Sequence, residues 1–258
     1  MVNLYKRTFI SYWVIAVILL AGLWAWLTLR PQDFAVALFV MLVVILATVF
    51  ILRRISAKLF NEEVMAPFLN CQINEFMEKL DKRLSGKRSA NNRSSYYYLK
   101  AMGYNALGDY DKEYECAQNV SGQAYRAEYY KHHINYFINK DMFTEALDYM
   151  KQLEEYMPGV RNQQYRESIE LFLKTSDYAI KVRQGDYEGA EEFLSEVIEK
   201  SSDEPMITRV SYTYNLAKVI FLKGKDMELA GKYFRFVIEN AGDTKFRKLA
   251  EEKLARIE

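Results

Sequence analysis

The length, charge and composition of the chain exclude several classes of protein. Its 258 residues carry 35 Lys and Arg against 34 Asp and Glu, a formal net charge of +1, so no strong field attracts nucleic acid or an anionic membrane surface. With 11 Gly and 4 Pro, the composition disfavours a turn-rich all-β chain and excludes collagen-like and low-complexity chains. Two Cys exclude a disulfide-dense secreted scaffold.

Two uncharged runs near the N-terminus predict a hairpin of membrane-spanning helices. Residues 8–29 form an uncharged run of 22, and residues 34–52 form one of 19. Each run is close to the ~20 residues that a helix needs to cross ~30 Å of hydrocarbon. The four-residue linker between them contains Pro31 and suits a tight turn between helices. A buried core helix is the alternative for each run, but the second run lacks the polar stripe that such a helix keeps.

The charges that flank the two runs predict an orientation. Arg30 is the one basic residue between the runs, and the other five flanking basic residues lie outside: Lys6, Arg7, Arg53, Arg54 and Lys58. By the positive-inside rule, both termini and the soluble part then face the cytoplasm, in a multi-pass integral protein of the cell membrane. A cleaved signal peptide is the alternative for the first run. Neither run contains a charged residue, which favours an anchor over a transport pathway.

Residues 55–93 are predicted to form a stalk that ends in a polar linker. Apolar residues recur there with helical spacing, at Leu69, Ile73, Phe76, Leu80 and Leu84. Pro67 is expected to open this helix at its first turn, and the polar run 85–95 predicts a loop. We therefore divide the chain into an anchor (1–54), this stalk (55–93) and a C-terminal domain (94–258).

One short pattern recurs four times in the C-terminal domain. In each copy a Gly or Asp ends one helical stretch, and an aromatic residue or Met follows it. One further position, near the start of the next helical stretch, can be aligned between the copies. That position is held by Glu113, Ala146, Ala190 and Ala230, so the copies step by 33, 44 and 40 residues. Gly and Asp at such turns stop one helix and cap the next, and Ala lets the two helices approach closely. The pattern predicts successive helix pairs and an all-α domain.

The four copies resemble tetratricopeptide repeats (TPR), whose period is about 34 residues. The second copy fits best, through the packing residues and closing proline Tyr130, Phe137, Phe143, Ala146, Met150 and Pro158. The resemblance covers residues 94–242 and implies an α-solenoid of about four helix pairs, although Glu113 departs from the usual Ala. Residues 244–257 fit the capping helix that such arrays need. A helical bundle or another α-solenoid is the alternative.

The sequence contains no recognisable catalytic or metal-binding motif. His132 and His133 are adjacent, so on one helix they point about 100° apart and cannot share one metal well. Cys71 and Cys116 have no paired partners for a zinc site, and Gly-rich phosphate loops and nucleophile elbows are absent. Basic residues are too sparse near the tyrosines for a nucleic-acid stacking surface. We expect a protein that is not an enzyme, with no cofactor, no metal and no nucleic-acid partner.

The TPR resemblance implies a concave groove lined by the first helix of each pair. The lining positions that we expect to bind a partner are Tyr98, Asn105, Lys131, Asn135, Arg183, Tyr214 and Lys218. Their aromatic, amide and basic side chains suit an extended or helical peptide of acidic character. The leading hypothesis is a membrane-tethered scaffold or adaptor that binds a protein or peptide at the cytoplasmic face. The alternatives are a regulatory sensor that binds a small peptide or metabolite, and an enzyme without a recognisable motif.

Overall fold

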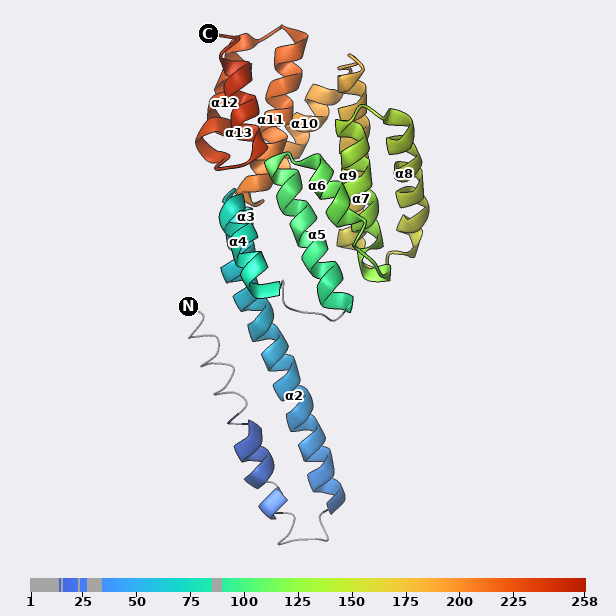
Figure 1. The fold of residues 1–258 in the computed structure, drawn as a ribbon, viewed down its shortest axis with the longest axis vertical. Helices are drawn as coiled ribbons and strands as arrows, with labels where there is room; N and C mark the ends of the chain where they lie inside the picture. The colour runs from blue at the N-terminus through green and yellow to red at the C-terminus, as the bar shows by residue number, and fades with distance from the viewer. Residues whose placement is uncertain (1–13, 15, 23, 27–33, 85–89) are drawn as a thin grey trace. The chain divides into compact units, whose positions relative to one another are not determined.

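The computed structural model describes residues 14, 16–22, 24–26, 34–84 and 90–258, and every regular element within them is a helix (Figure 1). The prediction of an all-α chain is therefore confirmed for this part of the sequence. The chain divides into two compact units after Met65, whereas the sequence pattern predicted boundaries after residues 54 and 93. Each unit is described by itself below.

The first unit contains the long apolar helix α2 (Phe34–Phe60), which continues as the π-helical turn Asn61–Met65. Helix α2 thus runs past residue 52, where the predicted second span ends. Its large apolar side chains are exposed, with 68% of Phe39 and 60% of Leu46 accessible to solvent. Among the described residues it is the one helix long and apolar enough to cross a membrane. Half of the predicted first span (8–29) lies outside the described residues, although 16–22 and 24–26 are helical.

The second unit begins with two helices that the sequence pattern assigned to a stalk, α3 (Ala66–Leu69) and α4 (Ile73–Leu84). Helix α4 packs against α5 (Ala90–Leu107), so it belongs to the helical domain. The remaining helices are α6 (Tyr110–Ala117), α7 (Arg126–Asn139), α8 (Phe143–Tyr156), α9 (Gln163–Arg183), α10 (Ala190–Lys200), α11 (Met206–Lys223), α12 (Met227–Asn240) and α13 (Lys245–Leu254).

The expectation of a loop over residues 85–95 is wrong for its second half, because α5 already begins at Ala90. Two serines in this half bond to the segment that follows α6. The Ser94 hydroxyl accepts a hydrogen bond from the backbone N–H of Ser121 at 3.2 Å, and the Ser95 hydroxyl contacts that of Tyr125. A polar composition marks loops only on average, and here tertiary partners keep the serines within a helix.

The predicted turns share one backbone conformation. In each copy of the pattern, the residue that ends the first helix has a positive φ: 82° at Gly108, 57° at Asp141, 87° at Gly185 and 67° at Gly224. In the second copy this residue is Asp141 and not Gly. Among residues other than Gly, Asp and Asn tolerate a positive φ best. Recurrence of the same turn gives the second unit a repeat-like construction.

At three of the four turns the helices on either side pack as a pair, α5 with α6, α7 with α8 and α11 with α12, whereas α10, after the third turn, packs mainly against α11. The four positions expected between paired helices, Glu113, Ala146, Ala190 and Ala230, are all 0% exposed. Two caps follow the expected chemistry, because Asp109 and Asp226 accept hydrogen bonds from backbone N–H groups in the first turns of α6 and α12.

Two apolar cores support the second unit. One is formed by α7, α8 and α9, and the other mainly by α10 to α13. Helix α9 contributes to both, through Ile169, Leu173 and Ile180 to the first and Val182 to the second. Because one helix supplies both cores, the two halves of the unit are connected by packing as well as by the chain.

The last helices of the second unit return to its first helices. Helix α3 packs against α11, and Cys71, between α3 and α4, belongs to the core that α10 to α13 form. Figure 1 shows the upper ends of α3 and α4 next to the lower ends of α11 and α13. Helix α13, predicted as a polar cap, packs against α12 and α11. The start and the end of the helical array therefore contact each other.

Candidate functional site

The seven residues expected to line a groove lie on the first helix of each pair, in agreement with the repeat pattern. Tyr98 and Asn105 lie on α5, Lys131 and Asn135 on α7, Arg183 at the end of α9, and Tyr214 and Lys218 on α11. Their environments differ, however, and they do not form one open surface. Tyr214 is 6% exposed, and its ring lies 5.3 Å from that of Phe246 and 6.1 Å from that of Phe234.

Lys131 is held by neighbouring side chains. Its ammonium group lies 3.1 Å from the Glu128 carboxylate and over the rings of Tyr165 and Phe172. The Tyr165 hydroxyl donates a hydrogen bond to the same carboxylate at 2.7 Å. Because both side chains of the Lys131–Glu128 pair are mostly buried, this lysine connects α7 to α9 and is not a free docking cation.

Tyr98 and Arg183 also have partners within the fold. The Tyr98 ring lies 5.7 Å from that of Tyr125, and burial raises the pKa of its hydroxyl. The Arg183 guanidinium donates to Asp141 at 2.5 Å and to the side-chain oxygen of Asn139 at 3.0 Å. This contact links the end of α9 to the turn between α7 and α8, and it leaves the Arg183 side chain 28% exposed.

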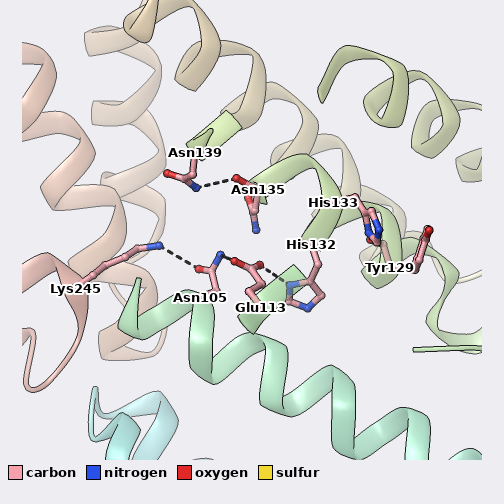
Figure 2. A network of polar contacts seen from close by, with 8 residues as sticks. All are labelled: Asn105, Glu113, Tyr129, His132, His133, Asn135, Asn139 and Lys245. Atoms are coloured by element: carbon pink, nitrogen blue, oxygen red, sulfur yellow. Dashed lines mark hydrogen bonds and ion pairs between the residues drawn. The ribbon is translucent and has the colours of Figure 1, made fainter. Parts of the chain in front are cut away.

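Four helices meet in a polar network around Glu113, which Figure 2 shows from close by. Glu113 is 0% exposed. One oxygen of its carboxylate lies 2.7 Å from Nδ1 of His132, and the other accepts a hydrogen bond from the Asn105 amide at 2.8 Å. The Asn105 oxygen in turn accepts from the Lys245 ammonium group at 3.3 Å. The network therefore joins α5, α6, α7 and α13.

Glu113 occupies the small-residue position of the first turn, so the repeat pattern alone would bury it. A buried carboxylate is tolerated when hydrogen bonds satisfy it, and Asn105 and His132 supply them here. Nε2 of His132 is buried without a hydrogen-bond partner among the described residues. Among the described residues, both oxygens of the Glu113 carboxylate therefore have a hydrogen-bond partner, whereas the His132 ring has one at Nδ1 alone.

His133 packs among aromatic rings, on a different side of α7 from His132. Its ring stacks on Tyr149 at 4.8 Å, and its Nδ1–H donates to the carbonyl oxygen of Tyr129 at 2.8 Å. Burial lowers the pKa of His133, which favours the neutral ring. No group of three or more metal-binding side chains is found among the residues that the structure describes.

Sequence reasoning missed two members of the network, Glu113 as a hydrogen-bonded centre and Lys245. The signal for Glu113 was a charged residue at a position that the other copies fill with Ala. Lys245 gave no such signal, because it opens a helix expected to present a polar face to water. Its ammonium group instead lies over the rings of Tyr110 and Phe246. Burial lowers its pKa to about 8.

These features define a class of protein: an all-α, helical repeat-like chain with a buried polar network and one helix able to cross a membrane among the residues described. Comparison of the chain with protein-family models, with curated proteins and with solved structures finds no match.

Proposed function

We propose that this chain is a membrane-tethered, TPR-like scaffold or adaptor, whose helical domain holds a protein or peptide partner at the cytoplasmic membrane face without catalysis. The observation that carries the proposal is the exposure of apolar side chains along α2, including Phe39, Leu46 and Phe50. Full burial of one such side chain is worth about 1.5–3 kcal/mol, so a helix of this kind requires an apolar surrounding. A bilayer supplies one along the apolar part of the helix, before Arg53.

The tether in this proposal is a hairpin of two spans with both termini in the cytoplasm. The first span is the uncharged run 8–29 and the second is the apolar part of α2. Arg53, Arg54 and Lys58 follow the apolar part of α2, and basic residues mark the cytoplasmic end of a span. A tethered domain meets membrane-bound partners at a raised effective concentration, so modest affinity is sufficient.

The binding surface in this proposal is the side of the repeats formed by their first helices. The recurring turns with positive φ at Gly108, Asp141, Gly185 and Gly224 support a repeat array, and such arrays bind partners on extended surfaces. Within that side, Lys131 and Tyr214 are packed inside the fold. We therefore assign partner contact to the exposed Arg183 and to the half-buried Asn135 and Lys218, with Tyr98 and Asn105 at the margin.

Photo-crosslinking in native membranes tests the surface assignment. A photoreactive amino acid replaces Asn135, on the proposed binding side of α7, in the full-length chain. The matched control replaces Leu147 on α8, whose side chain is 50% exposed. We expect a discrete protein adduct from position 135 and none from position 147. An adduct only from position 147, or none from either position, would contradict the assignment.

Cysteine labelling tests the orientation. Cys71 and Cys116 are buried and free, and burial raises the pKa of each thiol to about 11, so both should react slowly with maleimides. A Glu258→Cys variant therefore provides the reporting thiol. In intact cells it should resist a membrane-impermeant maleimide and should react after permeabilisation. Labelling of intact cells would place the C-terminus outside and refute the proposed orientation.

A further inference from the structure

A cluster of cationic side chains lies where α11 and α13 meet. Lys218 belongs to α11, and Lys245 and Lys253 belong to α13. The two helices pack through Tyr214 on Phe246 and through the Lys253 ammonium group over the Phe221 ring. Arg183, from the end of α9, lies close enough to influence the titration of both Lys218 and Lys245. We call these four residues, Arg183, Lys218, Lys245 and Lys253, the cation cluster.

The three lysines of the cation cluster are half-buried, and they have no carboxylate within ion-pair distance among the residues that the structure describes. Lys245 has only the hydrogen bond to Asn105 and its ring contacts. Lys253 has only the contact with Phe221. Lys218 has no hydrogen bond, ion pair or ring contact within the described part of the chain. Most of their donor capacity is therefore free, because each ammonium group offers three N–H donors.

Of the anionic groups around the cluster, Asp141 and Glu113 already have partners, and Glu252 lies near Tyr214. Asp141 is paired with Arg183 at 2.5 Å, and the Glu113 carboxylate bonds to Asn105 and His132. Positive charge consequently exceeds the negative charge available to balance it. Holding like charges together in a partly desolvated place costs free energy unless an anion joins them.

The titration of the lysines agrees with this geometry. Burial lowers the pKa of Lys218, and the nearby Arg183 and Lys253 lower it further. Burial also lowers the pKa of Lys245 to about 8, against the opposing effect of Glu113. Perturbed groups that gather in one place are a mark of binding sites as well as of active sites.

We propose that the cation cluster binds a compact oxyanion, the phosphate or carboxylate group of a ligand. Ammonium and guanidinium groups form their strongest hydrogen bonds with such oxygens. The arrangement supplies a planar guanidinium and three point-like ammonium donors from three helices, α9, α11 and α13, which suits a group with several acceptor oxygens. The inference goes beyond the scaffold proposal, because the site stands whether the oxyanion belongs to a small molecule or to a partner protein.

Thermal unfolding of the full-length chain in a non-ionic detergent tests the proposal. The probes are inorganic phosphate and a hexaglutamate peptide, each compared with sodium chloride at equal ionic strength. A ligand that binds only the folded state raises the melting temperature, and we expect a rise of several degrees from at least one probe at millimolar concentration. The Lys218→Met, Lys253→Met double variant should lose this rise. Lys151→Met, at an exposed position on α8, should keep it.

The pattern of results identifies the source of the oxyanion. A rise with phosphate alone indicates a small-molecule ligand, and a rise with hexaglutamate indicates an acidic segment of a partner. If the double variant fails to fold, Lys253→Met alone replaces it, with line broadening of the phosphate ³¹P resonance as a second measurement. No rise beyond that of chloride, or a rise that survives loss of the lysines, would overturn the proposal.

Discussion

The carboxylate of Asp243 accepts a hydrogen bond from the backbone N–H of Ile73 at 2.5 Å, across 170 residues of sequence. Its second oxygen accepts from the N–H of Asn74 at 2.8 Å. These N–H groups open α4 and have no partner within that helix, and a carboxylate also suits the positive end of a helix dipole. The N–H of Asp243 donates in turn to the Cys71 carbonyl oxygen at 3.1 Å. These contacts fasten the end of the helical array to its start.

Gly242 should be essential to this closure. Its φ is 54°, and a Cβ built there would lie 2.2 Å from the carbonyl oxygen of Cys71. Gly242→Ala must therefore separate the two backbones, in addition to straining its own. We expect it to lower the free energy of unfolding by about 3 kcal/mol or more, since overpacking and backbone strain are among the largest effects of single substitutions.

The matched control is Gly224→Ala. Gly224 also has a positive φ, 67°, but a Cβ there would meet no atom within 4 Å. The control therefore measures the backbone strain alone, about 1 kcal/mol. Urea unfolding of both variants in detergent, followed by circular dichroism, gives the comparison. Equal losses in the two variants would mean that the contact between residues 242 and 71 does not constrain the fold.

The repeat pattern and the structure lead to opposite predictions for a substitution of Glu113. The pattern alone suggests that Glu113→Ala, the residue found in the other copies, should stabilise the fold. The structure suggests the opposite, because Ala would leave Asn105 and His132 without their common partner and would open a cavity. We expect Glu113→Ala to destabilise by about 2–4 kcal/mol and Glu113→Gln, which keeps the shape, to destabilise less. A stabilised Ala variant in urea unfolding would refute the role of the network.

Ala146 and Ala190 follow two of the repeated turns, and both are 0% exposed. A Leu side chain at either position has no space, so Ala146→Leu and Ala190→Leu should each destabilise by about 1–3 kcal/mol through overpacking. Thr144→Leu provides a control on α8, because residue 144 is exposed. The melting temperatures of the three variants in detergent measure these changes in stability. Unchanged melting temperatures for both core variants would count against close packing at the repeated turn.

The depressed pKa of Lys245 predicts a dependence of stability on pH. The group has a pKa of about 8 in the folded chain, against 10.5 when unperturbed. Between these two pKa values, Lys245 is protonated in the unfolded chain and mostly neutral in the folded chain. The free energy of unfolding therefore rises with pH over this range. Below pH 8 the side chain is charged in both states, and its destabilising effect is fully present. Lys245→Met should remove this slope and should stabilise the fold at pH 7 by up to about 3 kcal/mol.

The measurement compares the wild type with Lys245→Met from pH 7 to pH 9.5, in buffers free of phosphate. Taking the difference between the two proteins cancels the titration of groups that they share. Parallel stability curves would show that Lys245 is not desolvated in the folded protein.

The sequence predicted the features that depend on local pattern. The turn that ends each first helix and the buried position that follows it are set by a few adjacent residues, so the repeat pattern alone places Ala146 and Ala190 between helices. The apolar part of α2 could also be predicted, because residues 34–52 contain no charged residue. Periodicity also indicated the buried face of α4, at Ile73, Phe76 and Leu80.

The features that depend on distant contacts could not be predicted. Asp243 is an ordinary turn residue in sequence, and its role arises only because the chain returns to the start of α4 just before α13 begins. Lys131 and Tyr214 were expected to line an open groove. Lys131 is instead held by Glu128 and by rings of α9, and Tyr214 is covered by Phe246 of α13. The sequence pattern predicts which face of a helix points into the fold. It does not predict which distant segment packs against that face.

The proposed function depends above all on α2 and the preceding uncharged run holding the helical domain at a membrane. Alkaline carbonate extraction of membranes from cells that make the full-length chain tests this tether, because high pH releases peripheral proteins and leaves membrane-spanning proteins in the pellet. We expect the chain to remain in the pellet after extraction and to enter the soluble fraction only with detergent. Recovery of the chain in the alkaline supernatant would contradict the tether.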